Sequence, residues 1–232
     1  MSALRRRKRE DHRMIIYGSS LSPFVRKVLA VAAEKALDFE VRPTGFPDHS
    51  AEFLKASPLK KMPAIRDGDF TLADSSAIAH YLDAKYPEPR LIPAGPEQRG
   101  QTIWFDEFAD TVLVGCGVKM FFNRIVAPRF MGREGDEAAA AAAERDELPP
   151  ILDYLDRVVP DPGGYLVGDS LTLADISIAS PFANLRHACP DLEEARHPRA
   201  FAFADSILSR PSLAPLIERE RELLARQPEP AQ

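Results

Sequence analysis

The chain has 232 residues, of which 45% are hydrophobic and 28% are charged, a composition typical of a folded globular protein. No run approaches the roughly 18 apolar residues that a membrane-spanning helix needs, which argues against a membrane partner. The net charge is −5, but residues 1–13 carry +4 and the remainder −9, which argues against nucleic acid as the main partner.

The amino-terminal segment, residues 1–13, contains an unbroken basic run from Arg5 to Arg9. Such a run can bind nucleic acid or direct a protein to a compartment. No apolar segment follows it, so it is not a secretory signal, and no aromatic residues are interleaved for stacking on bases. We expect a disordered basic tail.

Residues 14–87 alternate short strand and helix signals. The pair Asp67-Gly68 separates two short apolar segments, which is a strong hairpin signal. The expected elements are a strand at 15–17, a helix from Pro23, a strand at 39–42, a loop-rich stretch, a hairpin at 62–72 and a helix at 75–86.

Residues 88–96 are rich in proline and predict a linker between domains. From residue 97 to 227 the patterns are helical throughout, so the chain changes from mixed α/β to all-α and should form two domains. The expected helices are 97–127, ending before Pro128, one from Asp136 that is kinked or broken at 148–151, then 173–186, 198–208 and 212–226.

The two cysteines, Cys116 and Cys189, are far apart and lack CxxC spacing. They form neither a disulfide framework nor a zinc pattern, and they fit a reducing cytoplasm. The five histidines show no HxxxH or HExxH spacing, so we expect no metal site.

Ser22-Pro23 opens the first helix. Taken alone, this pair is a common helix start, with serine as the N-cap and proline in the first turn. The same position combines free backbone N–H groups with the positive end of the helix dipole, so it also suits an anion such as a thiolate. Ser19 and Ser20, in the preceding turn, are alternative hydroxyl donors.

Three further motifs follow. Met62-Pro63 precedes a strand, where proline is either a plain turn residue or a cis residue that leaves the backbone of Met62 to pair with an extended ligand. Asp74-Ser75 begins a helix as a cap, and the same groups could hold an ammonium and a carboxylate. Thr172 and Asp175 match a capping box, which we interpret as structural.

Together these motifs resemble the cytosolic glutathione transferase family over residues 14–225, in particular its serine-type, tau-like or zeta-like bacterial members. Residues 17–28 resemble the first strand and helix of a thioredoxin-like domain. Residues 61–65 resemble the family's cis-proline loop and 72–78 its acid-serine motif. Residues 168–175 resemble the capping signature of the all-α domain.

The resemblance implies a glutathione transferase that serves detoxification in the cytoplasm, acts as a homodimer and uses glutathione as co-substrate. Ser22 would stabilise the glutathione thiolate, and Met62, before Pro63, would pair with the cysteinyl backbone. Asp74 and Ser75 would hold the γ-glutamyl end. Lys61 would bind the glycyl carboxylate. The chain lacks a clear counterpart of the second basic residue that tau-like members supply from the segment after strand two, and His49 and Lys55 lie nearby without an assignment.

Two departures from the family bear on the activity. Ser22 stands where thiol-transferring members carry cysteine, which makes disulfide exchange less favoured. The double serine with cysteine of zeta-like members is absent, which weakens an isomerase assignment. A non-catalytic glutathione-binding or protein-interaction module, or a specialised isomerase or dehalogenase, stays open.

The electrophile should lie in a cleft between the domains. The long helix offers apolar side chains for this pocket, although any one of them could equally belong to the core. The candidates are Phe105, Phe108, Val112, Met120 and Phe121.

Overall fold

The computed structural model describes residues 13–44 and 50–226. The chain divides into two compact units, the first ending at Pro89 and the second beginning at Arg90. Nearly all of the predicted basic tail, and His49, lie outside the described residues.

The first unit is built on a four-stranded sheet. Its order is β2-β1-β3-β4, with β1 parallel to β2 and the other pairs antiparallel. Tyr17, the last residue of β1, pairs with Arg42 on one side and Ala64 on the other. The strands are β1 (Met14–Tyr17), β2 (Phe39–Arg42), β3 (Ala64–Asp67) and β4 (Phe70–Ala73). The predicted hairpin is therefore present.

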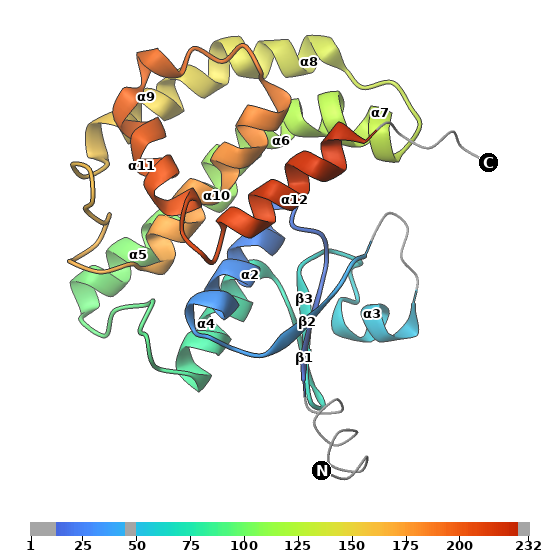
Figure 1. Ribbon diagram of the computed structural model, residues 1–232, viewed down its shortest axis with the longest axis vertical. Coiled ribbons are helices and arrows are strands. Elements are labelled where there is room, and N and C mark those ends of the chain that lie inside the picture. Colours follow the sequence, from blue (N-terminus) through green and yellow to red (C-terminus); the bar gives the residue numbers. More distant parts are fainter. Residues whose placement is uncertain (1–12, 45–49, 227–232) are drawn as a thin grey trace. The chain divides into compact units, whose positions relative to one another are not determined.

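Two helices, α2 (Pro23–Glu34) and α4 (Ser75–Lys85), pack together beside the sheet, and α3 (Ala51–Ala56) lies on the other side (Figure 1). The α3 side encloses a small core in which the rings of Tyr17 and Phe53 lie 5.9 Å apart. The sequence predicts a loop-rich stretch where the structure has α3. A six-residue helix is too short to display a helical period, and it forms here because Ser50 caps it and Phe53 is buried.

A buried ion pair closes the first unit. The Lys35 ammonium lies 2.7 Å from Asp83 and also donates to the carbonyl oxygens of Tyr86 and Pro89. The Lys35 side chain is fully buried. Three acceptors around one ammonium tie the end of α2 to the segment that follows α4.

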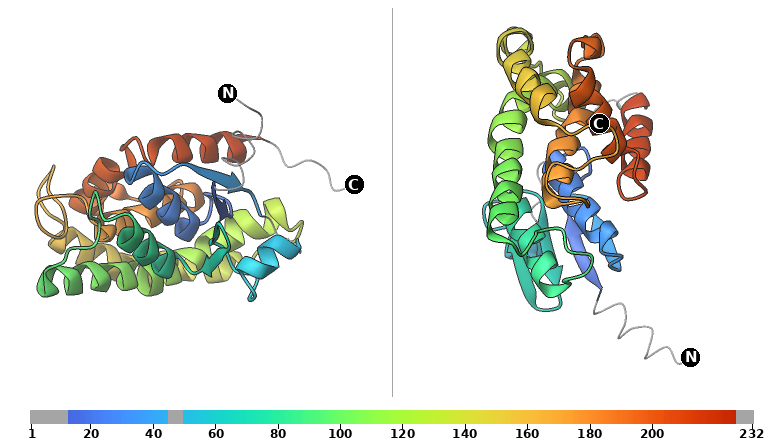
Figure 2. Two further views of the ribbon diagram at one scale, coloured as in Figure 1. Left: turned by 90° about the horizontal axis from the view of Figure 1, so that it is seen from below. Right: turned by 90° about the vertical axis from the view of Figure 1, so that its left-hand side faces the viewer.

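The second unit is helical. A continuous helix runs from Pro96 to Phe130 and is seen lengthwise in green in the right-hand view of Figure 2. Its parts are α5 (Pro96–Phe108), the π-helical turn η1 (Ala109–Leu113), α6 (Val114–Phe121), the π-helical turn η2 (Phe122–Val126) and α7 (Ala127–Phe130). The others are α8 (Glu137–Ala142), the π-helical turn η3 (Ala143–Glu147), α9 (Leu148–Val158), α10 (Leu173–Ala188), the 3₁₀ turn η4 (Glu194–Arg196), α11 (Pro198–Leu208) and α12 (Ala214–Ala225).

The expected helix end before Pro128 was wrong, and of the kink or break expected at 148–151 the break does not occur. The long helix continues past Pro128, and the helix from Glu137 continues through Pro149 and Pro150 to Val158. A π-helical turn precedes the prolines in both places, η2 in the first case and η3 in the second. Such a turn shifts the hydrogen bonds by one residue and makes room for a ring that has no N–H to donate.

The helix Pro96–Phe130 is the one described segment long and apolar enough to cross a membrane by length and composition, with a mean hydropathy of 1.2 over 18 residues. The count of apolar residues in the sequence had suggested no such segment. A core helix passes the same test, and here α5 and α6 pack against α10. Helix α10 is buried along almost its whole length.

The start of α10 confirms the predicted capping box. Asp175 is fully buried and accepts hydrogen bonds from the backbone N–H of Thr172 at 2.7 Å and from its hydroxyl at 2.9 Å. It also accepts from the N–H of Leu166 at 2.7 Å. Burial raises the pKa of the Asp175 carboxyl, while these hydrogen bonds oppose the rise. The motif fixes a buried helix start.

Candidate functional site

Ser22 is the N-cap of α2, as the sequence predicted. Its backbone is extended and its Oγ accepts a hydrogen bond from the N–H of Val25 at 3.5 Å. Its own N–H donates to the carbonyl of Ser19 at 3.0 Å. Capping uses a lone pair of Oγ, so the hydroxyl proton can be donated to an acceptor at the same helix end.

The turn before Ser22 is held close to α2. Gly18 has φ +141°, and a Cβ built there would lie 2.5 Å from Cγ2 of Val25. Only glycine fits this backbone and this spacing. Ser19 Oγ accepts from the N–H of Leu21 at 3.4 Å. Both Ser19 and Ser20 are half-buried.

The Met62–Pro63 peptide bond is cis, which settles the choice left open by the sequence. Met62 lies outside the paired register of β3, which begins at Ala64. The preceding loop is fixed by Ser57, whose buried hydroxyl accepts from the N–H of Lys61 at 3.0 Å and donates to its carbonyl at 2.6 Å. The side chain of Lys61 is exposed.

Asp74 is the N-cap of α4 and has a φ of +85°, which is unusual for a residue with a side chain. Its carboxylate accepts from the N–H groups of Ser76 and Ala77, each at 3.0 Å. Ser75 follows as the first residue of the helix and is buried. Strained backbone of this kind occurs preferentially at functional sites.

The structure brings these three motifs together. The backbone of Gly18 lies against Met62, because a Cβ at Gly18 would be 3.4 Å from the Met62 Cβ. The N–H of Asp74 donates to the carbonyl of Pro63 at 3.3 Å. The turn before Ser22, the cis-proline loop and the start of α4 therefore meet, whereas Thr172 and Asp175 belong to the second unit.

The apolar residues that were predicted to line the electrophile pocket differ in how far they are buried. Phe105 and Phe108 are half-buried and Val112 is 40% exposed. Phe108 stacks on Trp104, with ring centroids 5.5 Å apart. Met120 and Phe121 are buried, and the Met120 sulfur lies 3.4 Å from the thiol of Cys189.

Two residues near the three motifs were not predicted from the sequence. One is Ser57, the C-cap of α3. Its position directly before Pro58 is the sequence feature that could have identified it. The other is Lys27, an almost fully buried lysine that donates to Ser76 Oγ at 3.2 Å. Nothing in the local sequence marks Lys27, because a lysine in an amphipathic helix is ordinarily exposed.

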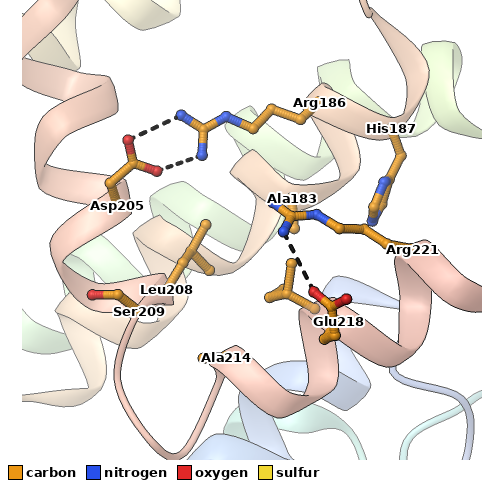
Figure 3. A pocket seen from close by; sticks show the side chains of 10 residues that line it. Ala183, Arg186, His187, Asp205, Leu208, Ser209, Ala214, Glu218 and Arg221 are labelled. Atoms are coloured by element: carbon orange, nitrogen blue, oxygen red, sulfur yellow. Dashed lines mark hydrogen bonds and ion pairs between the residues drawn. The ribbon is translucent and has the colours of Figure 1, made fainter.

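A cavity of about 480 Å³ lies among α10, α11 and α12 (Figure 3). Its charged side chains pair with one another: Arg186 with Asp205, and Arg221 with Glu218. None of the predicted site residues lines it. Within residues 13–44 and 50–226, no group of three His, Cys, Asp or Glu side chains could hold a metal ion.

Neither cysteine offers a reactive thiolate. Cys116 and Cys189 are both buried and belong to the second unit. Burial raises the pKa of the Cys116 thiol to about 11 and that of Cys189 to about 12. Ser22, Ser19 and Ser20 therefore remain the candidate groups at the joined motifs.

Comparisons with known proteins show the family to which the chain belongs. The family model of the glutathione S-transferase N-terminal domain matches residues 16–90 of this chain. The family model of the C-terminal domain matches residues 121–220. A glutathione S-transferase of Hyoscyamus muticus is 32% identical over 212 residues, covering 88% of this chain and 98% of the relative.

Two solved structures are similar over most of their length. A glutathione S-transferase from Rhodospirillum rubrum F11 has a TM-score of 0.78 and 27% identity, covering 88% of this chain and 91% of that one. One from Methylobacterium radiotolerans, in complex with glutathione sulfonate, has a TM-score of 0.73 and 28% identity, covering 88% and 94%. Sequence, fold and motifs agree, and the chain belongs to the glutathione S-transferase family.

Proposed function

We propose that this protein conjugates the thiolate of glutathione to small electrophiles, and that the Ser22 hydroxyl stabilises the thiolate. The observation that carries the proposal is the junction of the Ser22 turn, the cis-proline loop and the start of α4 in one place. Relatives named glutathione S-transferases support the activity.

The free energy by which Ser22 and the helix start must stabilise the thiolate is small. Lowering the thiol pKa from about 8.5 to about 6.5 needs about 2.7 kcal/mol of preferential thiolate stabilisation. A hydrogen bond to a charged group contributes about 1.5–3 kcal/mol, and a helix N-terminus about 0.3–2 kcal/mol. The Ser22 hydroxyl and the start of α2 are sufficient, so Ser22 acts as a donor and needs no base.

The remaining residues would bind the peptide. The Met62 backbone, outside the sheet register, pairs with the cysteinyl part, and Lys61 binds the glycyl carboxylate. Asp74 binds the γ-glutamyl ammonium, while Ser75, the first residue of α4, binds the carboxylate. Glutathione would thus span the three joined motifs.

Two further parts of the proposal are the site that binds the electrophile and the association of two copies into a homodimer. Phe105, Phe108 and Val112 are the apolar candidates with exposed surface, and Phe108 also belongs to an aromatic cluster with Trp104 and Tyr154. Trp104 is 49% exposed, and such an aromatic surface suits either a ligand or a second copy.

Phe108→Ala distinguishes these two uses. A raised KM for the electrophile with an unchanged sedimentation coefficient assigns Phe108 to substrate binding. A shift towards the monomer in sedimentation velocity assigns it to the dimer. Wild-type protein that sediments as a monomer would contradict the homodimer.

The central test is Ser22→Ala, with Ser20→Ala and Ser19→Ala as matched controls. We expect glutathione affinity within a few-fold of wild type, a conjugation rate about tenfold to a hundredfold lower, and a pH–rate profile moved to higher pH. The ultraviolet absorbance of bound thiolate gives a direct titration. Unchanged kinetics would transfer the role to whichever control is impaired.

Turnover with a halogenated aromatic and glutathione tests the activity itself. Binding of glutathione without turnover of any member of an electrophile panel would contradict conjugation. That result would instead favour a non-catalytic glutathione-binding module.

A further inference from the structure

The cavity among α10, α11 and α12 lies wholly within the second unit (Figure 3). None of the residues that we propose to bind glutathione lines it. Its volume of about 480 Å³ falls in the range of about 300–1,000 Å³ that is usual for pockets that bind small molecules. The cavity is large enough for a ligand, and the chemistry of its lining indicates which kind.

The buried part of the lining is largely apolar. Ala183 of α10, Leu208 of α11 and Ile217 of α12 line the cavity and are 3%, 7% and 8% exposed. Each of the three helices therefore contributes apolar surface. A ligand with an apolar part would be stabilised by covering this surface, because apolar groups that leave water contribute favourably to binding.

One of the two ion pairs at the cavity is already fully engaged. Arg186 donates to Glu194 from Nε at 2.7 Å and from Nη2 at 2.9 Å. It also donates to Asp205 from Nη1 and, at 3.2 Å, from Nη2. Two carboxylates thus hold this guanidinium, which has five N–H donors in all. This pair ties α10 to α11 and leaves little donor capacity for a ligand.

The second pair, Arg221 and Glu218 on α12, is open. Its closest nitrogen–oxygen distance is 3.7 Å, which is longer than a hydrogen bond, and the side chains are 62% and 65% exposed. Within residues 13–44 and 50–226 neither side chain has another hydrogen-bond or ion-pair partner. Exposed pairs of this kind contribute little to stability. Both charges are therefore available to a ligand.

His187 adds an acceptor to the same lining. Its side chain is 10% exposed, and its Nε2 lies 3.4 Å from a carboxylate oxygen of Glu220. A carboxylate beside Nε2 favours the tautomer that carries the hydrogen on Nε2, which leaves Nδ1 as an acceptor. In the described part of the chain Nδ1 has no hydrogen-bond partner. Such an acceptor suits an N–H group of a ligand.

We propose that this cavity binds a zwitterion with an apolar body, the chemistry of a free aliphatic amino acid. The carboxylate pairs with Arg221, in the planar geometry that a guanidinium offers, and the ammonium pairs with Glu218 and His187. The aliphatic side chain covers Leu208 and Ile217. An α-amino acid carries both charges on one carbon atom, so it matches two opposite charges that lie close together. The site is independent of the proposed conjugation activity.

Four small probes test the three parts of this recognition. L-leucine has all of them, isoamylamine lacks the carboxylate, isocaproate lacks the ammonium and glycine lacks the apolar body. We expect saturable binding of L-leucine in a ligand-detected NMR titration. Each of the other three should bind about fivefold or more weakly, because it loses one pair or the apolar contact. No saturable binding of L-leucine, or glycine that binds as tightly, would overturn the proposal.

Matched variants of α12 test the two charges. Arg221→Gln should weaken L-leucine about fivefold without weakening isoamylamine, and Glu218→Gln should weaken L-leucine without weakening isocaproate. Arg219→Gln and Glu222→Gln change the same residue types at exposed positions of α12 that do not line the cavity, so both should bind L-leucine as the wild type does. All four positions are exposed, and equal melting temperatures would confirm that the variants fold.

The remaining outcomes separate this site from the proposed function. Equal weakening of L-leucine and isoamylamine by Arg221→Gln would overturn the pairing of Arg221 with the carboxylate. Displacement of L-leucine by glutathione would assign both ligands to one site and overturn the proposal. Arg221→Gln should leave conjugation unchanged. A wild type that binds L-leucine but conjugates no electrophile would contradict the proposed function and leave this inference standing.

Discussion

The backbone N–H of Asp74 donates to the carbonyl oxygen of Pro63 at 3.3 Å. This contact links the cis-proline loop to the start of α4, so two motifs that are eleven residues apart in the sequence share one geometry. Asp74 holds this position with a φ of +85° while its carboxylate caps the helix. The residue that caps α4 is therefore also the one that we propose to bind the γ-glutamyl ammonium.

Asp74→Asn should separate the two roles. Asparagine tolerates positive φ and keeps the capping oxygen, so the unfolding free energy should change by less than about 1 kcal/mol. The loss of charge should weaken glutathione binding about tenfold, as measured by calorimetry. Asp74→Ala should lose both stability and binding, and equal binding by Asp74→Asn and wild type would contradict the ammonium-binding role.

Gly18→Ala should strain the turn before Ser22. The new Cβ would lie 2.5 Å from Val25 in a backbone that side chains rarely adopt, so we expect about 1–3 kcal/mol of destabilisation and slower turnover. Gly100→Ala is the matched control, since Gly100 lies in α5 with no atom within 4 Å. Equal melting temperatures for the two variants would argue against this packing constraint.

Ser57→Ala should loosen the loop that carries Lys61 and Met62. It removes both hydrogen bonds to the Lys61 backbone, one of them donated by Lys61 and one accepted by it. We expect about 1–3 kcal/mol of destabilisation and a raised KM for glutathione. Asp136→Ala removes the α8 cap in the second unit and should lower stability without affecting KM.

Lys35→Met should destabilise the protein by about 3–5 kcal/mol, because it removes the ammonium that pairs with the buried carboxylate of Asp83. Urea unfolding measures this loss. The double variant Lys35→Met/Asp83→Leu should recover part of the stability, since no uncompensated charge remains. It should not recover all of it, because the carbonyls of Tyr86 and Pro89 lose their donor. A double variant no better than the single one would argue against a charge effect.

The cysteines should give a pH dependence of stability. Their folded pKa values of about 11 and about 12 exceed the ordinary value of 9.0, so the contribution of each buried thiol is constant below pH 9. Above pH 9 the unfolded thiols ionise first, and stability should fall by up to about 1.4 kcal/mol per thiol for each pH unit.

Urea midpoints at pH 8 and pH 10 measure this fall, and Cys116→Ala/Cys189→Ala should show a smaller one. At pH 8 the native protein should react slowly with an aromatic disulfide reagent and fully once unfolded. Rapid reaction of the native protein would contradict the burial of both thiols.

Much of the local structure of this protein could be predicted from its sequence. The Ser22-Pro23 cap, the hairpin at Asp67-Gly68 and the capping box of α10 depend on residues close together in the chain, and all three are present. The sequence wrongly predicted a helix end before Pro128 and left a kink or a break open at 148–151, because the π-helical turns that accommodate the rings depend on the packing of the long helices.

The joining of the motifs is a property of the fold alone. Ser22 by itself is a helix cap, and the contacts of Gly18 with Met62 and of Asp74 with Pro63 are what bring its turn next to the cis-proline loop and the start of α4. The burial of Lys27 likewise follows from the packing of α4 on α2, which no local pattern encodes. Sequence determined the caps, turns and strands, because these depend on near neighbours. Tertiary structure decided which of them meet, because that depends on the pairing of β1 with β3 and on the packing of α2 with α4.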